Sequence, residues 1–360
     1  MLRGPVTAGA AAIACLLAVT PVASEAEQPI DIWSLRMIRF EFDNDIFLDS
    51  DDAFTAGWSL QLHSKLLDTW NPAFSGWIGR VPGLGDDGEG GRIARWAFGA
   101  TQMIITPKDL SIAAPQPDDA PWAGVLGGYA SWSSYDNRRL AAMQVYLGCM
   151  GPCAQADHVQ TWVHDFFNRG VPPEGWSNQL VNQFLGNLNY EYRYKVWADD
   201  EAAYAAGRWG NDLSIGAQAG VGNLATLAEG WVEIRFGWGL PMGFAKTADP
   251  PPTGIALDPV YLDPVKPLPN LRGPHIYFTL VTRGVWLARF APAEGGETEN
   301  GSFHPSVNPV PGNLQVLVGL HIAGIRGGFH ITSYRYIDES RKVGVRGDLN
   351  WISLSFEVRF

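Results

Sequence analysis

The chain has 360 residues, with 26 lysines and arginines against 37 aspartates and glutamates, so its net charge is −11 at neutral pH. Its isoelectric point is near 5.1. Without a basic patch, a protein cannot gain affinity for nucleic acid by releasing counterions from phosphates, so we expect no nucleic-acid partner. After residue 26, no stretch approaches ~18 uncharged apolar residues, which excludes a helical membrane protein.

The first 26 residues have the pattern of a secretory signal peptide. Arg3 precedes an apolar run over residues 8–20, and small residues at 22–26 offer a cleavage site. The run is too short to span ~30 Å of hydrocarbon. Cys15 lies inside the run, which leaves a lipoprotein site as an alternative. We predict a signal peptide at residues 1–26 and a single domain at residues 27–360, because no internal repeat or linker divides the rest.

Four segments alternate between apolar and polar residues with the period of a β-strand. They cover residues 188–196, 232–238, 314–322 and 350–360. In the last segment, one face carries Ile352, Leu354, Phe356 and Val358, and the other carries Ser353, Ser355 and Glu357. Such alternation predicts strands with one apolar and one polar face.

Two fold classes bury or expose these faces differently. A soluble β-sandwich would pack the apolar faces together, whereas an outer-membrane barrel turns them to lipid and places aromatic residues at both interfaces. The 15 tryptophans and 11 tyrosines suit such girdles, and a strand ending on Phe360 resembles the terminal signal of outer-membrane proteins. We favour an all-β transmembrane barrel in the cell outer membrane. Long loops are expected on one side of it, formed by turn-rich segments at 86–91, 107–121, 249–274 and 292–312.

One stretch has helical spacing instead. Apolar residues recur from Asp157 to Phe167, and Asp157 can cap this helix with Gln160 as a capping-box partner. Gln160 and His164 are four residues apart and therefore share one side of the helix. We expect a short helix inserted in a loop, with its apolar face on the barrel and His164 facing a polar surrounding.

Of the seven histidines in the chain, His164 alone has a context that suggests catalysis. The other histidines, at positions 63, 158, 275, 304, 321 and 330, have ordinary contexts on strands, on a loop or at the helix start. Asn44 and Asp45 can form an Asx turn or supply oxygen ligands to Ca²⁺. No serine nucleophile elbow or zinc-protease helix occurs, so ester hydrolysis would need a water activated by a base such as His164 and a cation.

The two cysteines that follow the signal region are close together in the sequence. Cys149 and Cys153 are four residues apart, and export to an oxidising compartment favours a disulfide between them. A free pair is the alternative.

Several short motifs resemble those of the lipid A 3′-O-deacylases of Gram-negative outer membranes. They are Asn44-Asp45, the segment 54–57, Gly151-Pro152, Gln160 followed by His164, and Gly175-Trp176 followed by Gln179-Leu180. The resemblance implies a barrel of about twelve antiparallel strands with a helix in an extracellular loop. It further implies calcium-dependent removal of the 3′-linked acyloxyacyl group of lipid A by ester hydrolysis.

The resemblance also implies roles for individual residues. His164 matches the base, and Asn44, Asp45 and Thr55 match functional positions, with Asp45 in the Ca²⁺ environment. Arg138, Arg139 and Arg169 are the expected cations for the substrate phosphates. One departure is that the family's glutamate after the base is absent, and Glu174 follows several residues late. We expect a monomer whose partners are lipopolysaccharide and outer-membrane lipids. The alternative is a non-catalytic barrel of the same fold, acting as a channel or binding protein.

Overall fold

A computed structural model describes most of the chain after residue 34. The described residues are 35–44, 56–67, 70, 76–85, 93–136, 138–167, 171–199, 208–240, 243–244, 275–307, 313–324, 327–336 and 350–359. They belong to one compact unit, Ser34–Phe360. The expected signal peptide at residues 1–26 lies outside them. No helix among them is long and apolar enough to cross a membrane.

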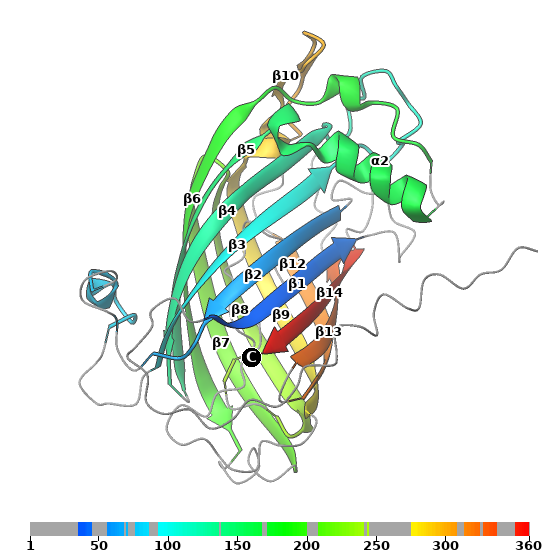
Figure 1. The fold of residues 1–360 in the computed structure, drawn as a ribbon. Helices are drawn as coiled ribbons and strands as arrows, with labels where there is room; N and C mark the ends of the chain where they lie inside the picture. The colour runs from blue at the N-terminus through cyan, green and yellow to red at the C-terminus, as the bar shows by residue number, and fades with distance from the viewer. Residues whose placement is uncertain are drawn as a thin grey trace, which may run out of the picture. The chain divides into compact units, whose positions relative to one another are not determined.

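The described strands form a closed antiparallel barrel in which twelve strands neighbour one another around the ring (Figure 1). Pairing from Met37 with Arg359 to Asn44 with Ile352 joins β1 to β14 and closes it. This confirms the barrel of about twelve strands. Its strands are β1 Leu35–Asn44, β2 Ala56–Ser64, β3 Ile93–Ile105, β4 Ala123–Tyr135, β5 Arg139–Met150, β6 Gln183–Ala198, β7 Trp209–Gly222, β8 Ala225–Trp238, β9 His275–Phe290, β12 Asn313–Gly324, β13 Gly327–Tyr336 and β14 Asn350–Arg359.

The two faces of the strands follow the predicted alternation. On β14, Ser355 and Glu357 are buried in the lumen, whereas the outward Phe356 is 51% exposed. Outward aromatic residues elsewhere are also exposed, including Phe184 at 68% and Trp209 at 64%. A sandwich would have covered these apolar faces, so the barrel is the confirmed fold class and the sandwich is excluded.

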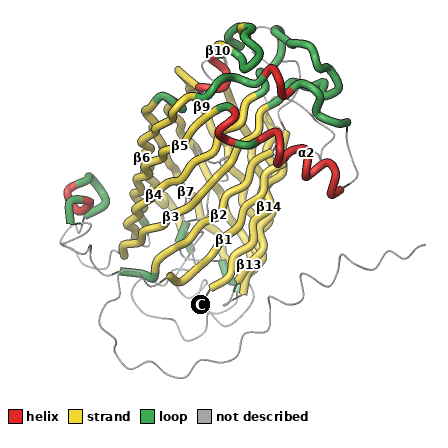
Figure 2. The backbone as a smooth tube through the Cα atoms, turned by 45° about the horizontal axis from the view of Figure 1, so that its top comes forward, coloured by secondary structure: helices red, strands yellow, loops and turns green. Residues whose placement is uncertain are grey.

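Short elements lie at the ends of the strands. They are η2 Ile78–Arg80, η3 Pro152–Ala154, α2 Ala156–Phe167, η4 Trp176–Asn178, η5 Ala291–Glu294 and the hairpin of β10 Gly296–Glu297 with β11 Phe303–His304. The predicted helix is therefore present and begins one residue earlier than expected (Figure 2). We call the end of the barrel where β1 finishes and β2 begins the helix end, because α2 follows β5 there.

The turn-rich segments are divided between the two ends of the barrel. Residues 107–121 and 292–312 connect strands at the helix end, whereas 86–91 and 249–274 connect strands at the opposite end. The expectation of long loops on one side only is therefore wrong. The apolar periodicity predicts where strands and connections lie in the sequence. It does not indicate at which end of the barrel each connection lies.

The lumen beside β6 to β9 is filled by charged side chains that pair with one another. Charged groups of both signs on these strands are buried and face inward. The ion pairs join Arg193 to Glu191 and Glu233, Lys195 and Arg235 to Asp212, and Arg283 to Glu229. Buried charges require such partners, and three of these five ion pairs join neighbouring strands.

Candidate active site

The chain that leads into α2 packs against the outside of the barrel wall. Gln102 is on the outer face of β3, because its neighbour Thr101 is on the lumen face. The Gln102 side chain accepts a hydrogen bond from Trp58 Nε1 at 2.8 Å and donates from Nε2 to the Ala154 carbonyl at 2.6 Å. The turn before α2 is thus fixed to the face of the wall that elsewhere meets lipid.

Glycine at position 124 permits this close approach. A Cβ atom there would lie 2.4 Å from Cβ of Ala156 and 3.0 Å from Cβ of Ala154. Real Cβ atoms do not approach so closely, so a larger residue at 124 would push the start of α2 off β4. The small residues on both sides therefore set the distance between the helix and the wall.

An apolar cluster holds the segment that follows α2. Trp122 and Trp176 meet edge to face, with ring centroids 5.0 Å apart, and pack with Ile104, Leu110 and Ala156. Gly175 lies directly against the Trp122 indole, since a Cβ there would be 2.4 Å from Nε1. The cluster ties the segment that follows α2 to the segment that precedes β4.

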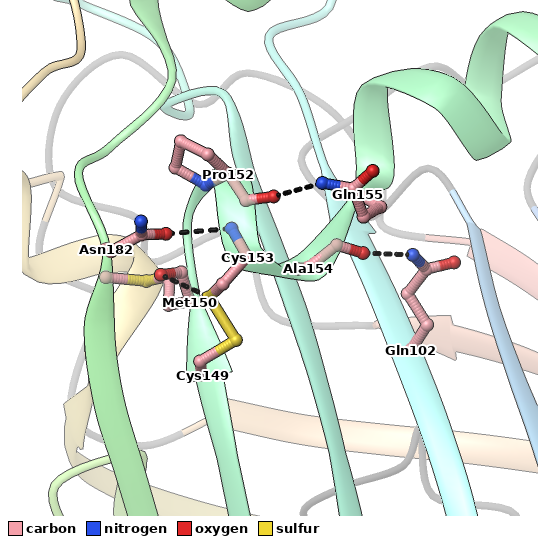
Figure 3. Close-up of a disulfide and its surroundings, with 8 residues drawn as sticks. All are labelled: Gln102, Cys149, Met150, Pro152, Cys153, Ala154, Gln155 and Asn182. Carbon is pink, nitrogen blue, oxygen red and sulfur yellow. Dashed lines mark hydrogen bonds between the residues drawn. A yellow bond between two sulfur atoms is a disulfide. The ribbon is translucent and has the colours of Figure 1, made fainter.

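A disulfide joins Cys149 at the end of β5 to Cys153 in η3 (Figure 3). The Cys153 N–H also donates to Oδ1 of Asn182 at 2.8 Å, which connects the same turn to the start of β6. Strand, turn and following strand are therefore cross-linked immediately before α2 begins. The favoured pairing of the two cysteines is the one present in the structure.

Gln160 is held by a tryptophan, and its predicted capping-box role is wrong. Trp176 Nε1 donates to Gln160 Oε1 at 2.8 Å. An indole N–H can only donate, so the orientation of the amide is fixed with Nε2 on the opposite side. Gln160 is 3% exposed, and its buried Nε2 has no hydrogen-bond partner within the part of the chain that the structure describes.

His164 lies one turn after Gln160 on the same side of α2. It is half-buried, and its Nδ1 atom is buried without a partner among the described residues. His158, by contrast, has a 75% exposed side chain that lies 3.8 Å from Asp157. The helix thus presents an amide donor and an imidazole together toward the wall, and turns the second histidine away.

The geometry of α2 carries His164 toward β1 and β2. From Ala156 to His164 the helix rises about 12 Å. Neighbouring strands are about 4.8 Å apart, so this rise spans two to three strands from the start on β3 and β4. Both views show α2 extending from the ends of β3 and β4 toward those of β2 and β1 (Figures 1 and 2).

The register brings the other predicted site residues to the same end. Asn44 ends β1 and pairs with Ala56 of β2 and Ile352 of β14. Thr55 directly precedes Ala56, and Asp45 directly follows Asn44, so the backbone gathers all three positions where β1 passes to β2. The side chain of Asn44, and the whole of Asp45 and Thr55, lie outside the described residues.

The cations expected for substrate phosphates are not brought to this site. Arg138 lies in the turn between β4 and β5 and Arg139 begins β5, both at the end of the barrel opposite α2. The 12 residues of β5 separate them from the helix end by about 36 Å, which corrects their expected position beside His164. The two arginines are close to α2 in the sequence but not in space, because the full length of β5 lies between them and the helix. Arg169 lies outside the described residues.

Glu174 is exposed on the loop after α2. Its backbone N–H donates to the carbonyl of Leu110 at 2.9 Å, which fixes the backbone to the loop between β3 and β4. Lys108 is an exposed cation on that same loop. No sequence motif surrounds Lys108, so its position near α2 becomes apparent only from the packing of this loop.

The oxygen donors at the β1–β2 junction suit a calcium ion in their chemistry. Carboxylate, amide and hydroxyl oxygens are the ligands that Ca²⁺ takes, and Asp45, Asn44 and Thr55 supply one of each. Within the described ranges, no group of three or more histidine, cysteine, aspartate or glutamate residues is placed to hold a metal.

Comparison with known proteins identifies the family. A family model described as outer membrane protein LpxR matches residues 11–360, and no curated protein sequence matches. The solved structure of LpxR from Salmonella typhimurium is 15% identical with a TM-score of 0.68, covering 90% of this chain and all of that one. An outer membrane channel from Pseudomonas putida F1 has 10% identity and a TM-score of 0.41, covering 95% of this chain and all of the channel.

The family match covers nearly the whole chain, and the first solved structure shares the fold. The chain belongs to the LpxR family of outer-membrane proteins, the lipid A 3′-O-deacylases that its motifs resemble, and is an outer-membrane β-barrel.

Proposed function

We propose that this protein hydrolyses the ester that links the 3′ acyloxyacyl group to lipid A, within lipopolysaccharide of the outer membrane. The observation that carries the proposal is a pair of buried polar atoms without partners among the described residues, Gln160 Nε2 and His164 Nδ1, on a helix that packs through Ala156 on the outer face of the wall. A lipid moving in the leaflet can reach this face laterally. The family match supports lipid A as the substrate.

His164 acts as the general base. An imidazole accepts a proton near neutral pH and can remove it from a water that attacks the ester carbonyl. Gln160 is a donor whose Nε2 is aimed by the hydrogen bond from Trp176, so it can hold either the attacking water or an ester oxygen. Because the amide is already oriented and buried, it needs no reorganisation at the moment of reaction.

Asn44, Asp45 and Thr55 would hold Ca²⁺ at the β1–β2 junction. When bound there, Ca²⁺ would polarise the ester carbonyl and offset the negative charge that develops on its oxygen. Lys108, an exposed cation on the loop between β3 and β4, would meet a phosphate of the substrate at the helix end, in the role first expected for Arg138 and Arg139. The helix end is then the extracellular end.

The test is mass spectrometry of lipid A after incubation with detergent-refolded protein. We expect His164→Ala to lower release of the acyloxyacyl group by about 10²–10⁴-fold, the usual cost of losing a general base, while the barrel still folds. His158→Ala is the matched control, since this exposed side chain is on another face of α2. Full turnover by His164→Ala, or equal loss in His158→Ala, would favour the non-catalytic barrel instead.

A further inference from the structure

The exposed part of α2 has an aromatic edge. Trp162 is 62% exposed and Phe166 is 67% exposed, and their rings stack with centroids 5.4 Å apart. They are one turn apart, so they form a continuous apolar strip along the helix. Two large aromatic side chains left in contact with solvent on a short helix would be costly in water.

The rest of the exposed surface of α2 is polar. Thr161 and Asp165 are exposed and lie one residue before Trp162 and Phe166, so each is about 100° away around the helix axis. The wall side carries Ala156 and Gln160, which are both buried. α2 therefore has three surfaces: one on the barrel wall, one polar edge and one aromatic edge.

The place of α2 determines what can cover the aromatic edge. The start of α2 packs through Ala156 against Gly124 on the outside of the wall, and the turn before it is bonded to Gln102 through the Ala154 carbonyl. This outer face is the surface that meets lipid in an outer-membrane barrel, and aromatic side chains gather at its interface level. A helix that packs on this face and has one apolar and one polar edge suits an interfacial position.

We propose that α2 is an interfacial membrane helix whose Trp162–Phe166 edge is inserted among the acyl chains of the adjacent leaflet. The polar edge with Thr161 and Asp165 faces the aqueous side. This goes beyond the proposed hydrolysis and does not require it, because any bilayer-forming lipid supplies the acyl chains.

The experiment is photocrosslinking of the full chain, refolded into vesicles of phosphatidylcholine without lipid A. Phe166→p-benzoylphenylalanine and Trp162→p-benzoylphenylalanine are compared with the same replacement at Asp165 and Thr161, their exposed neighbours. Lipid adducts are measured by mass spectrometry. We expect about ten-fold more adduct at the aromatic positions than at the polar ones, since the aromatic edge alone is in hydrocarbon.

Two results would overturn this proposal. One is equal labelling at Asp165 and Phe166, or none at Phe166. The other is labelling that occurs only after lipid A is added, which would make the edge a substrate-binding surface and leave α2 outside the leaflet. Loss of hydrolysis in the Proposed function test has no bearing on either readout.

A second measurement serves if the photoreactive variants do not fold. In protein containing 5-fluorotryptophan, the ¹⁹F resonance that disappears in Trp162→Phe belongs to Trp162. We expect doxyl-labelled lipid to broaden it and a water-soluble relaxation agent to leave it sharp. The reverse pattern contradicts insertion.

Discussion

Replacing Trp176 with phenylalanine isolates the hydrogen bond that aims the Gln160 amide. The ring remains to pack on Trp122, but Nε1 and its 2.8 Å bond to Gln160 Oε1 are lost. The amide is then free to turn, and a buried acceptor is left without its donor. Such a loss costs about 1–3 kcal/mol. If the same free energy is lost from the stabilisation of the transition state, turnover drops by about 5- to 150-fold.

The matched control is Trp122→Phe in the same apolar cluster. Trp122 is also buried, but its Nε1 has no hydrogen-bond partner within the described residues. Both variants remove similar volume, so they should lose similar stability in thermal unfolding. Only Trp176→Phe should lower kcat for release of the acyl group.

The KM and kcat values separate this explanation from a simple loosening of the loop. We expect kcat to fall in Trp176→Phe with KM nearly unchanged, because the amide acts at the reacting ester. Equal kcat losses in both tryptophan variants, or no loss in Trp176→Phe, would show that the orientation of Gln160 does not matter.

Further predictions concern the metal, the wall and the disulfide. Chelation of Ca²⁺ should abolish hydrolysis, and added Ca²⁺ should restore it, as assayed on lipid A. Leu354→Lys should cost about 2–4 kcal/mol in urea unfolding from bilayers, because it places a cation in lipid. Ser353→Lys should cost less, since it meets Asp43 across the strand pair. Reduction of Cys149–Cys153 should cost at most about 2 kcal/mol of barrel stability, measured by unfolding, yet lower turnover by loosening the turn before α2.

The fold was predictable from the sequence because the period of a strand fixes its faces. Along β14 each residue is either in the lumen or toward lipid, and a shift by one position would put Glu357 in hydrocarbon. The alternation of polar Ser355 with apolar Phe356 therefore predicts both the strand and which of its faces is turned to the lumen. Which end of the barrel a connection joins has no such signature, and so Arg138 and Arg139 were misplaced.

The candidate site was only partly predictable. His164 could be selected because it follows Gln160 by four residues on a helix, and helical spacing is a local property. The partner of Gln160 could not be found in this way, because Trp176 reaches it only after the loop folds back on β3 and β4. The pair Gly175-Trp176 gave a signal in the sequence, yet the function of the glycine is clear only from its contact with the Trp122 ring.

The contrast between the lumen and the outer wall bears on the choice between an enzyme and a channel. In the lumen, Arg193, Asp212 and Glu233 are committed to ion pairs across strands, so these charges already have the partners that burial requires. On the outer wall, Gln160 Nε2 and His164 Nδ1 are buried without partners in the described chain. Unsatisfied buried groups cost stability, and a ligand that completes their hydrogen bonds is one reason for a protein to retain them. Within the described residues, single atoms without a hydrogen-bond partner also occur in the lumen, such as Glu233 Oε2 and Arg235 Nη1, but those groups are already in ion pairs. The pair on α2 instead lies on the side of the barrel where a lipid ester would arrive under the proposed function. A pore lined by Arg193 and Glu233 would instead need these ion pairs to be broken.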